Sequence, residues 1–123
     1  LTGAVVVALG HVATGIMGTD ESLIEQIKSS SFTTGEKVWE FPLWAEYLDQ
    51  VKSKIADVKN LGAPGQAGSI AGGAFLNSFV QEDIPWCHFD IAGSAWGNKN
   101  LPYQNKGLAT GEMIRLVVDL LGV

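Results

Sequence analysis

The sequence has few of the residues on which several protein classes depend. It contains one cysteine, Cys87, so no disulfide can form within the chain, which excludes a small disulfide-stapled secreted module. Charged residues make up 17% of its 123 residues and hydrophobic residues 46%, a balance that excludes general disorder. No apolar run reaches the ~20 residues that a membrane-spanning helix needs, so we expect no membrane partner.

Basic residues are also scarce. Eight lysines and arginines stand against 13 acidic residues, which gives a net charge of −5. Phosphate binding requires a basic stripe, so the charge balance argues against a nucleic-acid partner for this segment. The chain has no initiating methionine, and no basic segment precedes its first apolar run. We therefore expect no signal peptide and interpret the chain as a fragment of a larger protein.

Apolar segments alternate with glycine-rich loops along the rest of the chain. The β-branched run 4–9, ended by Gly10, predicts a strand buried on both faces, and the run 86–92 predicts a second strand. Helices are expected from Asp20 to the serines at 29–31, from Pro42 to Ile55, over 74–80, and from a Thr110 cap to Leu121. Residues 60–73 and 93–107 are predicted to be long loops. Strands that alternate with helices indicate an α/β fold.

No complete catalytic constellation is visible in these elements. The only two histidines, His11 and His88, lie far apart in the sequence, so each is interpreted as a satisfied core or loop residue. Cys87 is interpreted as a small buried hydrophobe. Asp90 ends an apolar strand at the edge where α/β proteins place ligands. We favour a structural role for it, in which it accepts backbone N–H bonds from the following loop, over a catalytic one.

Several stretches together resemble the leucyl aminopeptidases, the cytosol aminopeptidase family (peptidase family M17). The order and spacing of these motifs agree over nearly the whole chain. The matching stretches are L-T-G-A at 1–4 with V-A-L-G at 7–10, G-E-K-V-W at 35–39, P-L-W at 42–44, K-S-K-I-A-D-V-K-N at 52–60, W-C-H-F-D-I-A-G at 86–93, and K-G-x-x-T-G at 106–111.

The resemblance implies the C-terminal portion of a catalytic domain with a mixed central sheet flanked by helices. It also implies a metal-dependent exopeptidase that releases N-terminal residues, with leucine favoured, from peptide substrates. Two zinc or manganese ions would bind the free amine, polarise the scissile carbonyl and generate a hydroxide. Members of this family are typically cytoplasmic homo-hexamers.

The resemblance assigns substrate contacts, but no metal ligand or general base, to this chain. The family's N-T-D-A-E-G-R motif and K-x-x-x-x-D region are absent and would lie upstream, so no catalytic or metal-binding residue is expected here. The family's substrate backbone contacts and oxyanion or bicarbonate site fall partly on Leu1, Thr2 and Gly3. Its pocket for the first substrate side chain, the S1 pocket, carries over to Leu61, Ala92 and Ala95.

Two further functions remain open on the sequence alone. The chain could belong to a noncatalytic relative or truncated product that serves as a binding or oligomerisation module. An intact upstream metal motif would exclude that alternative. DNA binding, which some bacterial members of the family show, receives little support from a net charge of −5.

Overall fold

The computed structural model describes residues 2–96 and 107–123 and confirms the α/β class. A three-stranded mixed sheet lies at its centre in the order β2-β1-β3. The central strand β1 (Thr14–Gly18) runs parallel to β2 (Val38–Glu40) and antiparallel to β3 (Cys87–Asp90). In the antiparallel pair Gly15 lies opposite Asp90.

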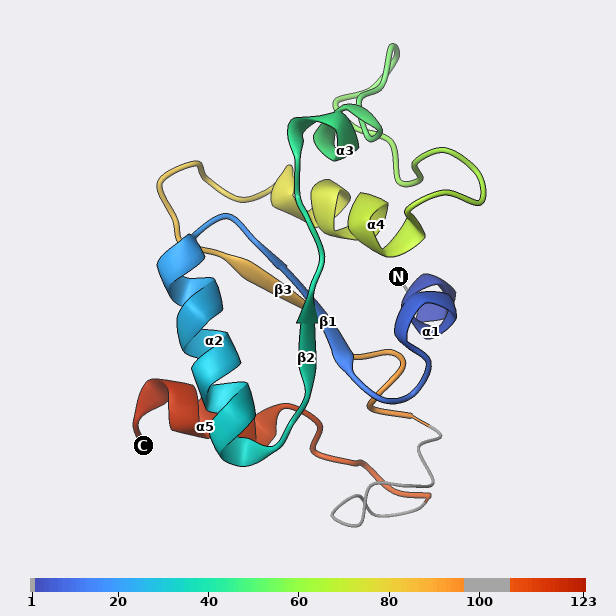
Figure 1. Cartoon of the computed structure of the whole chain (residues 1–123). Helices are drawn as coiled ribbons and strands as arrows, with labels where there is room; N and C mark the ends of the chain where they lie inside the picture. The colour runs from blue at the N-terminus through green and yellow to red at the C-terminus, as the bar shows by residue number, and fades with distance from the viewer. Residues whose placement is uncertain (1, 97–106) are drawn as a thin grey trace.

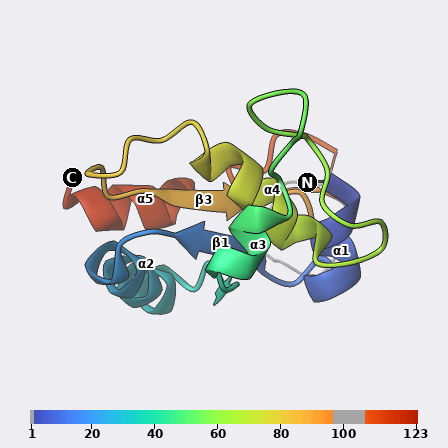
Figure 2. The ribbon, with the colours of Figure 1, turned by 90° about the horizontal axis from the view of Figure 1, so that it is seen from above.

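Five helices in the described part of the chain surround this sheet (Figures 1 and 2). Helices α2 and α5 lie together at one side, whereas α1, α3 and α4 lie at the other (Figure 1). Their bounds are α1 (Thr2–Leu9), α2 (Glu21–Thr34), α3 (Ala45–Asp49), α4 (Gly68–Asn77) and α5 (Ile114–Leu121). None of the described helices is both long and apolar enough to cross a bilayer.

Strand β1 contributes side chains to both sides of the sheet. Ile16 is fully buried in a cluster with residues of α2 and with Met113 and Leu116. The next residue, Met17, is also fully buried but lies against α4, because a Cβ placed on Gly73 would come within 2.5 Å of its Sδ. Consecutive residues of a strand face opposite sides, so one short strand joins the two helical groups.

The first predicted strand is wrong, because residues 2–9 form helix α1. The run of valines favours a strand by propensity, but a short apolar run does not distinguish a strand from a buried helix. One face of α1 is formed by Ala4, Val7 and Ala8, at spacings of three and four residues. Val5 is fully buried, and Gly10 ends the helix at φ 63°.

Other boundaries also differ from those expected. Helix α2 begins at the expected Asp20 cap, whose carboxylate accepts from the Leu23 N–H at 2.7 Å, but it continues past the serines to Gly35. The helix expected from Pro42 is reduced to α3, and Ile55 is 98% exposed. Strands β1 and β2 were not predicted, whereas β3 lies within the expected run 86–92.

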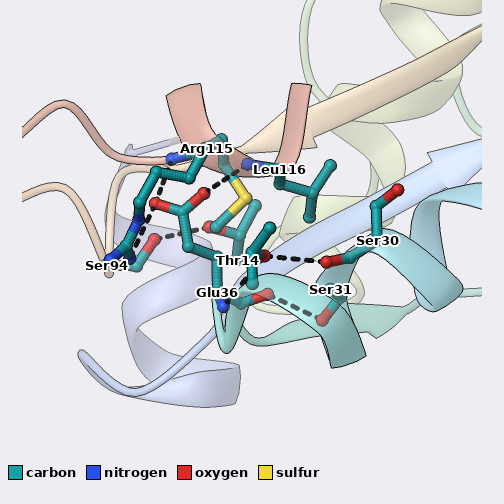
Figure 3. A network of polar contacts seen from close by, with 9 residues as sticks. Thr14, Ser30, Ser31, Glu36, Ser94, Arg115 and Leu116 are labelled. Carbon is teal, nitrogen blue, oxygen red and sulfur yellow. Dashed lines mark hydrogen bonds and ion pairs between the residues drawn. The ribbon is translucent and has the colours of Figure 1, made fainter. Parts of the chain in front are cut away.

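Helix α5 is capped by Glu36 rather than by Thr110 (Figure 3). The Glu36 carboxylate, 1% exposed, accepts from the backbone N–H groups of Met113 at 3.1 Å and Leu116 at 2.8 Å. Arg115 donates to the same carboxylate at 3.3 Å. The inward face of α5 is therefore centred on Leu116, whereas Ile114, Val117 and Leu121 are exposed.

Candidate functional site

The C-terminal end of β3 carries the first candidate site residue, Asp90. Its side chain is buried, and its Oδ1 accepts from the Ala92 N–H at 3.4 Å. Its Oδ2 has no hydrogen-bond partner among the described residues. Burial raises the pKa of this carboxyl, and the Ala92 bond only partly opposes that shift. The loop contact expected for Asp90 is therefore present, but as one long bond rather than several.

The neighbouring side chains of β3 are half-buried. Burial raises the pKa of the Cys87 thiol to about 11, and Cys87 packs against the core, as expected of a small hydrophobe. Burial lowers the pKa of His88, whose Nε2 has no hydrogen-bond partner in the described part of the chain. The other histidine, His11, lies with its Nδ1 2.8 Å from the carbonyl oxygen of Gly93.

The described residues do not fit a metal site. Among residues 2–96 and 107–123, no three His, Cys, Asp or Glu side chains come together in a way that could hold an ion. The described residues therefore provide no ligand set for a metal ion.

A largely apolar hollow of about 760 Å³ lies between α1, α4 and the loop that precedes α4. Leu61 lines it and is 78% exposed. The α1 face formed by Ala4, Val7 and Ala8 lines the hollow from the other side. Of the expected pocket residues, Leu61 therefore lies in a concave apolar surface that could receive an aliphatic group.

The other two expected pocket residues lie on the loop that follows β3. Ala92 and Ala95 are half-buried there, and neither lines the hollow that contains Leu61. This loop nevertheless lies against the end of α1. A Cβ added to Gly93 would lie 2.3 Å from the carbonyl oxygen of Gly10, the residue after α1, and 3.8 Å from Cγ2 of Val6. Helix α1 thus lines the hollow that contains Leu61 and, through Val6, also approaches the loop that carries Ala92 and Ala95.

The expected backbone contacts lie at the start of the same helix. Leu1 falls outside the described residues, and Thr2 is the first residue of α1. Gly3 is exposed, and a Cβ placed on it would meet no atom within 4 Å. The backbone at Gly3 is therefore accessible to a ligand in the described structure.

Three polar residues that hold the loop after β3 or the start of α5 were not predicted as site residues. Thr14 and Glu36 are buried, and Thr110 was assigned only a capping role. Their hydroxyl and carboxyl groups bind residues distant in the sequence, so no local pattern reports them. For Thr14 the weak signal was a polar residue inside the apolar segment V-A-T-G-I-M at 12–17, which requires a partner when it is buried.

Comparisons with known proteins find relatives that all carry the same family description. Residues 1–118 match the family model described as the cytosol aminopeptidase family, catalytic domain. The chain is 51% identical over 121 residues to a probable cytosol aminopeptidase of Geotalea uraniireducens, and 43% identical over 121 residues to one of Neisseria meningitidis. Each match covers 98% of this chain but 24% of the relative.

The fold is similar to that of a solved leucine aminopeptidase. A lysine-to-glutamate mutant of the tomato enzyme superposes with a TM-score of 0.86 at 36% identity, over 98% of this chain and 23% of the other. The chain thus spans about a quarter of the length of the proteins it matches. By this match over nearly all of its length, the chain belongs to the cytosol aminopeptidase family.

Proposed function

We propose that the full-length protein containing this chain is an aminopeptidase that releases N-terminal amino acids, leucine favoured, from peptides. The match of residues 1–118 to the family's catalytic domain is the observation that carries this proposal. In it, this chain is the C-terminal portion of that domain, and the protein is a cytoplasmic homo-hexamer.

The proposed role of this segment is to receive the substrate. Leu61, Ala92 and Ala95 form an apolar wall for the first side chain, and the small alanines leave room for a branched group. Leu1, Thr2 and Gly3 supply backbone contacts. Thr2 and Gly3 begin α1, and the first N–H groups of a helix lack partners within it and favour negative charge. An extra methylene in such a pocket is worth only ~1–3 kcal/mol, so selectivity is expected to be broad.

The proposed metals belong to the rest of the protein. Two zinc or manganese ions, held by residues outside this chain, would supply Lewis-acid polarisation of the scissile carbonyl and a hydroxide at neutral pH. The residues of this chain bind and orient the substrate.

The test is hydrolysis of leucine amide by the full-length protein with added manganese or zinc, before and after treatment with a chelator. The proposal predicts turnover that the chelator abolishes and either metal restores. A full-length protein that lacks an upstream N-T-D-A-E-G-R motif and shows no turnover under these conditions would support the noncatalytic module instead.

A further inference from the structure

Three consecutive residues of the loop after β3 are each bonded by a side chain from a distant part of the sequence. Gly93 O lies 2.8 Å from His11 Nδ1, and Ala95 O accepts from Thr110 Oγ1 at 3.2 Å. Between them, the Ser94 and Thr14 hydroxyl oxygens are 2.6 Å apart. Loops are ordinarily the more mobile parts of a fold, so three successive tethers indicate that residues 93–95 are held in a fixed position.

The central tether is the most deeply buried of the three. Thr14 is fully buried on β1, and Ser94 is 1% exposed (Figure 3). The Ser94 hydroxyl also lies 3.4 Å from Ile91 O, so it links the loop's own backbone to the central strand. A buried hydroxyl that loses its partner carries the full cost of its desolvation, so this pair strongly restricts where the loop can lie.

The loop also has little room to move toward α1. The 2.3 Å separation between a Cβ on Gly93 and the Gly10 carbonyl oxygen means that only glycine fits at this approach. Loop and helix are therefore in direct backbone contact while Thr14 holds Ser94 from the sheet. Ala92 and Ala95 lie on either side of Gly93–Ser94, and their own backbone is bonded as well. The Ala92 N–H donates to Asp90 Oδ1 at 3.4 Å, and the Ala95 N–H donates to Ile91 O at 2.8 Å.

We propose that Thr14 is a positioning residue that sets substrate preference through its bond to Ser94, by fixing Ala92 and Ala95 in the pocket wall. This inference rests on the proposed function, because it takes these two alanines to face the substrate's first side chain. Thr14 does not touch the substrate. Thr14 acts by keeping the apolar wall in one place, so that a branched substrate side chain binds to a preformed surface rather than to a mobile one.

The test compares Thr14→Val with Thr14→Ser in the full-length protein. Valine keeps the shape but removes the hydroxyl, whereas serine keeps the hydroxyl. We expect Thr14→Val to lower the ratio of kcat/KM for leucine amide over alanine amide by about fivefold, the equivalent of one net hydrogen bond. Thr14→Ser should keep the ratio within about twofold of the parent value, and so should Thr33→Val, which removes an exposed hydroxyl from α2.

Melting curves and one further variant separate the outcomes. A merely structural role of Thr14 would lower both kcat/KM values alike and leave the ratio unchanged in a folded Thr14→Val protein. If Ala95→Phe shifts the ratio while Thr14→Val does not, the positioning role is wrong and the pocket stands. If neither shifts it, the pocket assignment itself fails. Should Thr14→Val not fold, Ser94→Ala removes the same bond from the other side and decides by the same ratio.

Discussion

Asp90 shows how burial changes a single carboxyl group. Its pKa is raised because burial disfavours the charged form, and one long bond from Ala92 only partly offsets this. The folded state therefore binds the proton more tightly than the unfolded state. It follows that Asp90 lowers the free energy of unfolding as the pH rises from the unfolded pKa through the raised folded pKa.

We predict that Asp90→Asn gains stability relative to the parent protein as the pH rises. Asparagine keeps an acceptor for the Ala92 N–H but does not ionise, so it lacks the cost that the parent carries at higher pH. The difference in Tm between the two full-length proteins, followed from pH 4 to pH 8, should move in favour of the variant. Asp83→Asn, at an exposed position before β3, controls for the loss of one negative charge. A difference that moves the other way would contradict the burial argument.

Cys87 is expected to react slowly for the same physical reason. Burial raises the pKa of its thiol to about 11, from an ordinary value of 9.0, so at pH 8 its thiolate fraction is roughly a hundredfold lower. Alkylation of Cys87 by iodoacetamide, followed by peptide mass spectrometry, should be correspondingly slower in the native protein than after unfolding. Equal rates in the two states would show that the thiol is accessible and ionised.

At the scale of elements, the start of α5 depends on one buried carboxylate from another part of the chain. Glu36 accepts from two backbone N–H groups of this helix end and from Arg115. The residue before the helix, Met113, has φ 66°, a left-handed conformation that disfavours residues with a side chain. The Glu36 bond to the Met113 N–H holds that conformation in place.

We predict that Glu36→Gln loosens α5. Glutamine replaces one carboxylate oxygen, which accepts a hydrogen bond, with an NH2 group, which can only donate. At least one backbone N–H at the start of α5 therefore loses its hydrogen-bond partner inside the core. The loss should be on the order of 1–3 kcal/mol in the free energy of unfolding. Hydrogen exchange at the α5 amides should accelerate, whereas Glu25→Gln, on the exposed face of α2, should leave it unchanged. Unaltered protection of α5 in Glu36→Gln would refute the capping role.

How much of the architecture can be predicted from sequence depends on whether the signal is local. The Asp20 cap and strand β3 are set by neighbouring residues, and both were predicted. Helix α1 was missed because its valines favour a strand, and packing of Val5 and Val6 against distant residues overrides that preference. Glu36 and Thr14 were missed as structural partners because each binds residues far along the chain.

The sequence predicted the motifs of the candidate site, but it did not predict which of their residues lie together. The stretch W-C-H-F-D-I-A-G identified the family, and Ala92 and Ala95 follow from it by resemblance. The structure places both alanines outside the hollow that Leu61 lines. Spacing along the sequence does not predict this, because it does not determine how the loop after β3, α1 and the loop before α4 are arranged.

For the whole molecule, we predict that the isolated 123-residue chain has no peptidase activity. The proposed metals and catalytic groups belong to the rest of a protein of which this chain spans about a quarter. The measurement is hydrolysis of leucine amide by the pure chain with added manganese or zinc, beside the full-length protein as a positive control. Metal-dependent turnover by the isolated chain would place ligands within it.

The central claim, that this segment forms the pocket for the first substrate side chain, is tested most directly at Ala95. In the full-length protein, Ala95→Phe should place a ring where a branched side chain binds. Overpacking of this kind costs ~1–3 kcal/mol, so the ratio of kcat/KM for leucine amide over alanine amide should fall by about 5- to 150-fold. An unchanged ratio, in a variant whose melting curve shows that it is folded, would remove Ala95 from the pocket and contradict the account.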